Sequence, residues 1–291
     1  MLLDSASAMR EFYKSSMILI DDDFKFNKLL SFLNDTSYSV VDIETTGLSM
    51  WNGDSVRAIG FGNSSVQFFY DLQNSTEAQL KTLLFTLKKV PIIVGHNVKF
   101  DLSGMLGLGY EVPENQTIHD TIVAARLVTF EWKPQLGLDD LVAKYISKDA
   151  SRYKEAFHEL MKSRKIKKYS DIGFTELGVY CLNDVYYEAG LYELFLKMLA
   201  ESDLEDIWNL EVGVTRVSWG MEKRGVFIDR DYCSRTLPIL KLKSDEVKKE
   251  VEELAGYEVN LGSNPQLGKF FNSLGIHSTL KTKSKDNPKE S

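Results

Sequence analysis

The feature that most restricts the fold of this chain is an apolar run at residues 38–44, Tyr-Ser-Val-Val-Asp-Ile-Glu, which ends in two carboxylates. The run is typical of a buried strand. Because a strand repeats every two residues, Asp42 and Glu44 point to the same face. Two like charges repel and are poorly solvated there, so they do not suit a core. A pair of Mg²⁺ or Mn²⁺ ions would supply the counter-charge, an arrangement that suits two-metal phosphoryl chemistry.

Two further segments carry acidic residues in a similar setting. Asp101 follows Asn97 by four residues, just after an apolar run at 90–95 that predicts a strand. Strand ends of layered α/β sheets are a usual location for active-site groups. Asp184 lies in a predicted helix at 175–199, with Tyr180 one turn before it on the same face. A tyrosine hydroxyl placed there could hold an attacking water while the carboxylate binds a metal ion.

Roughly the first 200 residues alternate strand and helix patterns, which predicts an α/β layered domain. The turn 63–65 predicts a hairpin, and Thr76 and Gln79 form a capping box that starts a helix. Beyond residue 201 the pattern is helical, so we expect a first domain at 1–202 and a helical second domain at 203–291. The expected strands are 39–44, 57–62, 66–70 and 90–95, and the expected later helices are 119–130, 137–146, 204–224, 237–255 and one within 260–275.

Composition excludes several classes of protein. The formal net charge of −7 is not that of a bulk nucleic-acid binder, so any phosphate-binding surface must be local. Cys181 and Cys233 give no disulfide framework and favour a reducing compartment. The N-terminus has no signal-peptide pattern, and no apolar stretch approaches the roughly 20 residues that span a bilayer. We therefore expect a soluble cytoplasmic protein with no membrane partner.

Taken together, the three acidic segments resemble the motifs of a known family. Asp42-Ile-Glu-Thr-Thr-Gly-Leu48, Asn97-x-x-x-Asp101 with Phe100, and Tyr180-x-x-x-Asp184 are similar to those of the proofreading 3′–5′ exonuclease domain of family A (Pol I-like) DNA polymerases. That domain belongs to the DEDD exonuclease superfamily, and the resemblance covers residues 38–200 or so. Tyr180 stands four residues before Asp184, as in the tyrosine branch. The resemblance implies an RNase H-like α/β fold, a mixed sheet of about five strands flanked by helices.

The resemblance also implies a role for each residue. Asp42, Glu44, Asp101 and Asp184 would bind two Mg²⁺ or Mn²⁺ ions, and Tyr180 and Glu44, with one ion, would position and deprotonate the attacking water. The other ion would stabilise charge on the leaving 3′-oxygen. Leu48 would wedge against the terminal bases, and Asn97 and the backbone of Thr45 and Thr46 would hold the terminal nucleotide. The expected activity is hydrolysis of single-stranded DNA from its 3′ end to nucleoside 5′-monophosphates.

Residues 203–291 resemble the entry to the polymerase module of the same family and the base of its thumb. The segments that carry this resemblance are 211–217, 221–229, 260–267 and 274–276. The palm and fingers motifs do not follow, so no polymerase activity is expected from this chain. A natural subunit that works with a separate polymerase subunit and a piece of a longer protein both stay open.

Two other functions share the motifs. An RNase D-like 3′–5′ RNA exonuclease has all three, although the polymerase-like segment argues against it. A catalytically inactive DNA-binding scaffold would be expected to lack carboxylates that this chain retains. Several single features have two readings. The basic segment 162–168 is either a DNA contact or a solvated surface, Asp120 is either an outer acid of the site or a helix N-cap, and structural roles are favoured for His96 and His119.

Overall fold

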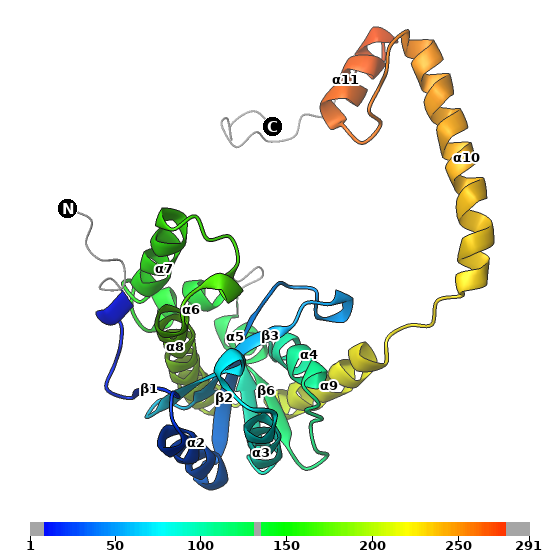
Figure 1. The fold of residues 1–291 in the computed structure, drawn as a ribbon. Coiled ribbons are helices and arrows are strands. Elements are labelled where there is room, and N and C mark those ends of the chain that lie inside the picture. The colour runs from blue at the N-terminus through cyan, green and yellow to red at the C-terminus, as the bar shows by residue number, and fades with distance from the viewer. Residues whose placement is uncertain (1–8, 131–134, 278–291) are drawn as a thin grey trace. The chain divides into compact units, whose positions relative to one another are not determined.

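A six-stranded mixed sheet forms the centre of the first compact unit of the chain, Met1–Gly225, in the computed structural model, which describes residues 9–130 and 135–277 (Figure 1). The strands are β1 (Met17–Leu19), β2 (Tyr38–Thr45), β3 (Val56–Gly62), β4 (Gln67–Asp71), β5 (Ile92–Gly95) and β6 (Thr117–Asp120). They lie in the order β1-β4-β3-β2-β5-β6. β2 is antiparallel to β3 and parallel to β5, which is parallel to β6. The carboxyl ends of β2, β5 and β6 therefore meet at one edge of the sheet.

Helices cover both faces of this sheet. The helices of the unit are α2 (Asp23–Asp35), α3 (Glu77–Leu87), α4 (Val98–Gly107), α5 (Thr121–Thr129), α6 (Leu138–Tyr145), α7 (Arg152–Ser163), α8 (Phe174–Glu201) and α9 (Glu205–Arg224). Apolar residues of α2, α3 and α4 share one core with Val41 and Ile43 of β2. Val40 packs instead with Val185 of α8. Side chains alternate along a strand, so Asp42 and Glu44 lie on the α8 face with Val40.

A glycine lets α8 approach the sheet closely. A Cβ atom on Gly60 of β3 would lie 2.6 Å from Cγ2 of Val185 and 2.7 Å from Sγ of Cys181. Any larger residue would push α8 away from the strand. Because Cys181 and Asp184 are one helical turn apart, this approach brings the acidic part of α8 over β2 and β3.

Most of the elements expected from the sequence are confirmed. The four expected strands are present, and β3 and β4 form the expected hairpin, in which the N–H of Asn63 donates to the carbonyl of Val66 at 3.0 Å. α3 begins with the complete capping box of Thr76 and Gln79. The helix expected at 137–146 and those around 175–199 and 204–224 are α6, α8 and α9.

The structure differs from the expectation at several elements. The sheet has six strands rather than about five. Two of them were not expected: the three-residue β1, and the four-residue β6, which occupies the start of the helix expected at 119–130. α5 begins at Thr121, with Asp120 as its N-cap. The helix expected at 237–255 begins earlier, at Arg230. Strands this short hold too few residues for a period of two to be visible.

The second compact unit, Val226–Ser291, contains two helices in its described part, α10 (Arg230–Ala255) and α11 (Asn264–Ser273). Asp229 caps α10, its side chain accepting from the N–H of Tyr232 at 2.8 Å. The contacts group α9 with the first unit. The domain boundary expected between residues 202 and 203 stays a prediction. Residues 278–291 of the expected second domain lie outside the described residues. Within residues 9–130 and 135–277, every helix is too short or too polar to cross a bilayer.

Candidate active site

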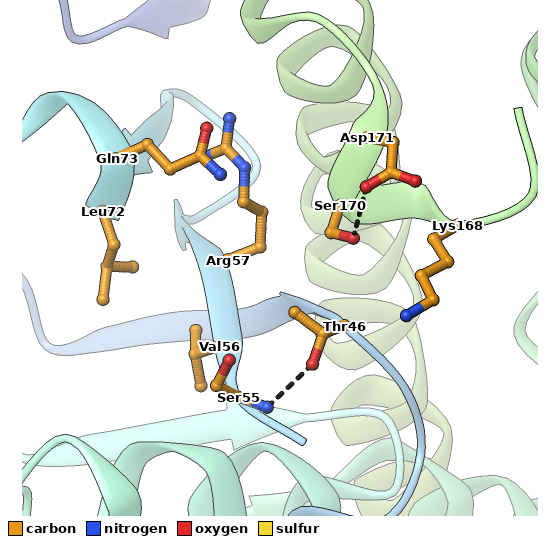
Figure 2. Close-up of a pocket in the computed structure, with 9 residues that line it drawn as sticks. All are labelled: Thr46, Ser55, Val56, Arg57, Leu72, Gln73, Lys168, Ser170 and Asp171. Carbon is orange, nitrogen blue, oxygen red and sulfur yellow. Dashed lines mark hydrogen bonds between the residues drawn. The ribbon is translucent and has the colours of Figure 1, made fainter. Parts of the chain in front are cut away.

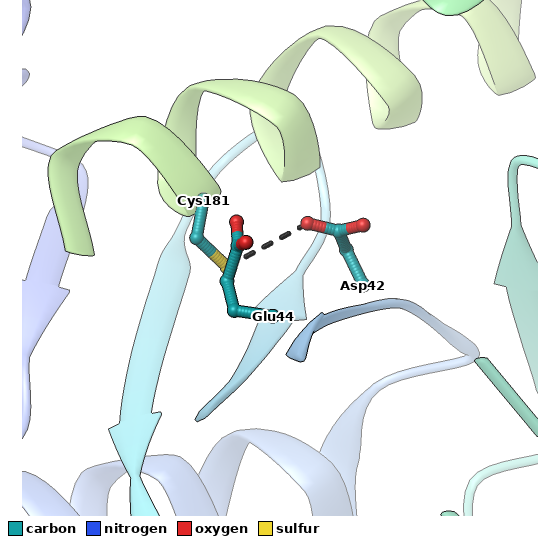
Figure 3. A group of neighbouring side chains, drawn as sticks. All are labelled: Asp42, Glu44 and Cys181. Carbon is teal, nitrogen blue, oxygen red and sulfur yellow. Dashed lines mark hydrogen bonds between the residues drawn. The ribbon is translucent and has the colours of Figure 1, made fainter. Parts of the chain in front are cut away.

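Asp42, Glu44 and Cys181 form the centre of the candidate site (Figure 3). One potential ligand atom from each lies within 4.8 Å of the other two, the single such group among the residues that the structure describes. Burial raises the pKa of the Cys181 thiol, which stays protonated and donates to Oδ2 of Asp42 at 3.6 Å. Hard divalent cations prefer oxygen to sulfur. Cys181 therefore orients Asp42, and the carboxylates supply the oxygen atoms of the site.

Asp101 reaches this centre from the first turn of α4. Its Oδ1 atom accepts from the backbone N–H of Ile43, at 3.1 Å, between the two carboxylates of β2. Asn97, just before the helix, adopts φ of 66°, a left-handed conformation that asparagine tolerates well. The turn is fixed by Asp120, whose carboxylate accepts from the N–H groups of Asn97 and Val98, both at 3.1 Å. Asp120 is thus both the N-cap of α5 and a support for α4.

Asp184 completes the site from α8, and it is held by two residues of α7 that the sequence analysis missed. The hydroxyl of Tyr153 donates to its Oδ1 atom. The ammonium of Lys154 lies 3.0 Å from the same oxygen and 2.7 Å from Oδ1 of Asp139. Burial disfavours the charge of Lys154, but the two carboxylates raise its pKa overall. Lys154 is therefore a cation beside Asp184 at neutral pH.

Tyr180 lies one turn before Asp184, in an aromatic cluster. Its ring stacks on Phe157 at a centroid distance of 4.2 Å and meets Tyr169 edge-on at 5.5 Å. Burial, followed by the negative charges of Asp184 and Glu44, raises the pKa of the Tyr180 hydroxyl far above its ordinary value. The hydroxyl stays protonated at neutral pH, so it can orient a water molecule by hydrogen bonding but cannot act as a base.

The four carboxylates share an electrostatic environment that opposes their ionisation. Burial is the largest cause of a raised pKa at Asp42, Glu44, Asp101 and Asp184. Repulsion by Asp184 adds to the effect at Asp42, whose pKa is raised to about 7. The ammonium of Lys154 acts in the opposite direction at Asp42, Glu44 and Asp184. One cation cannot balance four acids, so the site favours additional positive charge.

The raised pKa of Asp42 predicts that its own contribution to the stability of the metal-free protein falls as the pH rises. From about pH 3.9, the value of an unfolded aspartate, up to about pH 7, folded Asp42 holds a proton that the unfolded chain releases. Its contribution is fully present below that window and is lost through pH 7. At about 1.4 kcal/mol for each pKa unit, this contribution to the free energy of unfolding, measured in urea and EDTA as the wild-type value minus that of Asp42→Asn, should fall on the order of 2–4 kcal/mol between pH 5 and pH 8.

Asp42→Asn is the control for this prediction. The amide cannot titrate, so the variant lacks the pH dependence that Asp42 contributes. Glu44 and Asp101, whose pKa values are raised, and His96 and His119, whose pKa values are lowered, titrate in both proteins and largely cancel in the difference. A difference between the two proteins that stays constant from pH 5 to pH 8 would show that the pKa of Asp42 is not raised.

Glu188 is a fifth carboxylate that the sequence analysis missed. It lies one turn after Asp184 in α8, is 1% exposed, and its Oε1 atom is buried without a hydrogen-bond partner among the described residues. Burial, followed by the charges of Asp42 and Asp101, raises its pKa well above the ordinary value. A signal for it existed, because Tyr180, Asp184 and Glu188 repeat at the same helical spacing. Tyr153 and Lys154 give no comparable signal.

Three of the four residues expected to bind substrate, Thr45, Thr46 and Leu48, line a hollow of about 460 Å³ beside Glu44, together with Phe100, Lys168 and Tyr169 among others, whereas Asn97 does not line it. Leu48 is 85% exposed. The N–H of Thr46 donates to the carbonyl of Ser55 at 3.0 Å, so this group is already engaged. Asn97 is exposed, and its side chain makes no cap hydrogen bond. The hollow is large enough for a small ligand.

The two histidines make structural contacts. Nδ1 of His96 lies 2.8 Å from the hydroxyl of Thr121, and Nδ1 of His119 lies 2.8 Å from the hydroxyl of Tyr192. Burial lowers the pKa of each imidazole to about 4. Both rings are therefore neutral at pH 7, and neither belongs to the group of potential metal ligands found in the described residues.

Comparison with known proteins places this site within a family. Residues 17–200 match the family model of the 3′–5′ exonuclease of family A DNA polymerases. Two phage relatives, each named DNA polymerase DpoZ, come from Salmonella phage PMBT28 (24% identical) and Acinetobacter phage SH-Ab 15497 (29% identical). The matches cover 82% and 80% of this chain. The chain spans only 39% and 38% of the length of these relatives.

Solved structures share the fold. The POL domain of Pol1 from M. smegmatis, in complex with a DNA primer-template and dNTP, is 18% identical with a TM-score of 0.58, and the match covers 93% of this chain and 43% of that chain. NrnC from Brucella melitensis with bound Mg²⁺ is 14% identical with a TM-score of 0.51, and the match covers 72% and 93%. The expected RNase H-like α/β fold is confirmed.

Proposed function

Because this chain belongs to the family of 3′–5′ exonuclease domains of Pol I-like DNA polymerases, we propose that it removes nucleotides one at a time from the 3′ end of single-stranded DNA. The observation that carries the proposal is that Asp42, Asp101 and Asp184 lie close enough to Glu44 for their charges to raise its pKa, while Glu44 lines a hollow that Leu48 also borders. Each of these acids comes from a motif that the sequence analysis related to this family.

The reaction is hydrolysis of the terminal phosphodiester. A water oxygen bonds to phosphorus, the bond between phosphorus and the 3′-oxygen breaks, and the products are a nucleoside 5′-monophosphate and a strand with a new 3′-hydroxyl. The attacking water loses a proton, and the leaving oxygen gains one. Tyr180 and Glu44 position that water. Tyr180 does so as a neutral hydroxyl, because its pKa is raised far above neutral pH.

The side chains fit a pair of hard divalent ions. Their oxygen atoms are the ligands that Mg²⁺ and Mn²⁺ prefer, and no hydrogen bond joins the carboxylate of Glu44 to any described residue. We propose that Asp42, Glu44, Asp101 and Asp184 hold two such ions. The chemistry supplied by ions in such sites is acidification of a water molecule and compensation of charge on the phosphoryl and leaving oxygens. NrnC, which has the same fold, binds Mg²⁺.

The terminal nucleotide occupies the hollow beside Glu44. The exposed side chain of Leu48 wedges against the terminal base, and Asn97 with the backbone of Thr45 and Thr46 holds the nucleotide from the other side. Single strands are preferred, because a terminal base pair must open before its 3′ nucleotide enters, at a cost of a few kcal/mol.

Matched DNA and RNA oligonucleotides of one sequence test the substrate. With Mg²⁺ or Mn²⁺, the wild-type protein should digest the DNA oligonucleotide faster than the RNA oligonucleotide. Faster digestion of RNA would instead identify an RNase D-like RNA exonuclease. DNA binding without digestion of either strand would identify a catalytically inactive scaffold. Asp184→Asn is the control for contaminating nucleases, because it removes a carboxylate of the site and should digest neither.

We also propose that residues 203–291 connect the exonuclease domain to a polymerase module. The support is that both phage relatives are named as DNA polymerases and that this chain spans about two fifths of their length. The palm and fingers would be on the same polypeptide or on a separate subunit. Mass determination of the protein isolated from its natural source distinguishes these arrangements. A polypeptide of this length with no polymerase partner would contradict the proposal.

A further inference from the structure

A second hollow, of about 490 Å³, is shown in Figure 2 and shares lining residues with the hollow beside Glu44. It lies between the start of β3 and the turn Leu72–Asn74 on one side and the turn Tyr169–Asp171 on the other. Thr46 and Lys168 line both hollows. The proposed hydrolysis does not use this space. Its volume lies within the range of about 300–1,000 Å³ that small-molecule pockets occupy.

Arg57 is the buried polar side chain of this hollow. It is 6% exposed and forms an ion pair, through Nη1, with Asp71. Asp71 is itself held by the backbone N–H of Gln73 at 2.8 Å and by Nδ2 of Asn74 at 3.1 Å. The Nε atom of Arg57 has no hydrogen-bond partner among the described residues.

Two more polar side chains of the hollow have no partner. Among the described residues, no hydrogen bond or ion pair joins another residue to the side chain of Gln73 or to the ammonium of Lys168. Gln73 and Arg57 come from the β3 side, while Lys168 and Asp171 come from the opposite side (Figure 2). Leu72 and Val56 add an apolar wall. Donors, an amide and an apolar wall together suit a nucleobase with its phosphate.

The charges of the hollow select among possible ligands. Asp71 neutralises the charge of Arg57 in an ion pair. Lys168 forms no ion pair with a described residue, and Asp171 adds a negative charge on the same side of the hollow. A free nucleoside di- or triphosphate would bring several negative charges against one unpaired cation. A nucleotide within a strand brings one phosphodiester charge, which Lys168 can meet alone. The hollow therefore suits a nucleotide that is part of a nucleic-acid strand.

We infer that this hollow binds the penultimate nucleotide of the substrate strand and prefers a purine there, an inference that rests on the proposed exonuclease function. With the 3′-terminal nucleotide beside Glu44, the rest of the strand must leave through adjoining space, and the shared residues Thr46 and Lys168 connect the two hollows. Lys168 contacts the phosphate, while Arg57 and Gln73 face the base. Guanine offers two acceptors, and adenine offers an acceptor and a donor, which match a guanidinium and an amide.

Short substrates that differ at one position test this inference. We compare kcat/KM with Mg²⁺ for four tetranucleotides that end in thymidine and differ only in the penultimate base. The wild-type protein should cleave those with adenine or guanine several-fold faster than those with cytosine or thymine. Gln73→Ala should abolish most of this difference. Gln73→Ala should cleave thymidine 5′-monophosphate p-nitrophenyl ester, which has no penultimate nucleotide, at a rate within about twofold of the wild-type rate.

Gln73 is exposed, so its replacement should leave the fold intact, and Asn27→Ala, which removes an exposed amide of α2, is the matched control. Lys168→Ala should also reduce the slope of log kcat/KM against log salt by about 0.7, the value for one phosphate contact on a single strand. Equal rates for all four bases in the wild-type protein would overturn the inference. An equal effect of Gln73→Ala on oligonucleotides and ester would also overturn it. No cleavage of any substrate would instead refute the proposed exonuclease.

Discussion

Replacement of Asp184 by asparagine is expected to lower the rate of 3′-nucleotide release at least about 10³-fold, a loss of about 4 kcal/mol of transition-state stabilisation. The amide has nearly the same shape but no charge, so it removes a carboxylate from the proposed ion site and the ion pair with Lys154, which keeps its second partner, Asp139. Asp42→Asn should have an effect of the same size. Initial rates on 3′-labelled single-stranded DNA, at saturating Mg²⁺ or Mn²⁺, measure both.

The fold should survive these substitutions. Burial and mutual repulsion oppose ionisation of the carboxylates, so removal of one charge should leave the melting temperature of the metal-free protein unchanged or higher. Asp35→Asn, at the end of α2, is the control and should keep the wild-type rate. If Asp184→Asn retains more than about a tenth of that rate, the proposed site does not carry out the reaction.

Tyr180→Phe is expected to lower the same rate about 10²-fold, the low end of the range for general acid–base and positioning groups. Phenylalanine keeps the ring that stacks on Phe157 at 4.2 Å, so the aromatic cluster should stay in place. Only the hydroxyl that orients the water is lost. Because the carboxylates are untouched, the Mg²⁺ or Mn²⁺ concentration that gives half-maximal rate should hardly change.

Tyr192→Phe is the matched control for this variant. It removes a hydroxyl that contacts His119 at 2.8 Å and has no part in the proposed reaction, so it should keep the wild-type rate. Two results would show that Tyr180 has another role. One is a fully active Tyr180→Phe protein, and the other is a variant that needs a much higher metal-ion concentration.

Local patterns were sufficient to predict the central part of the fold. The alternation of residues 38–44 placed Asp42 and Glu44 on one face, and the structure has both on the side of β2 that α8 covers. The hairpin of β3 and β4 and the capping box at Thr76 were equally visible, because each depends on a few neighbouring residues.

Contacts between distant elements were not visible in the sequence. Tyr153 and Lys154 reach Asp184 across about thirty residues of chain, and the helical spacing of the buried residues of α7 does not show which distant carboxylate the helix will contact. The short strands β1 and β6 depend on pairing with β4 and β5 rather than on their own composition. Tertiary pairing overrides local propensity at such elements.

The candidate site itself was predictable as a set of residues but not as an environment. The motif spacing pointed to the four acids and Tyr180, whereas the contacts of the Cys181 thiol and the Lys154 cation with these acids are seen only once α8 packs on the sheet. Burial raises the pKa values of the four acids, and Lys154 lowers those of Asp42, Glu44 and Asp184. The roles proposed for the acids in metal binding and catalysis stay predictions.

The most direct measurement of the central proposal uses one single-stranded DNA oligonucleotide labelled at either end. With Mg²⁺ or Mn²⁺, the wild-type protein should release the 3′ label as a nucleoside 5′-monophosphate at once. The strand that carries the 5′ label should become shorter through a ladder of intermediates. EDTA should stop both, and added divalent ion should restore them. Release of the 5′ label as a mononucleotide first, or digestion that continues in EDTA, would contradict the assignment of a metal-dependent 3′–5′ exonuclease.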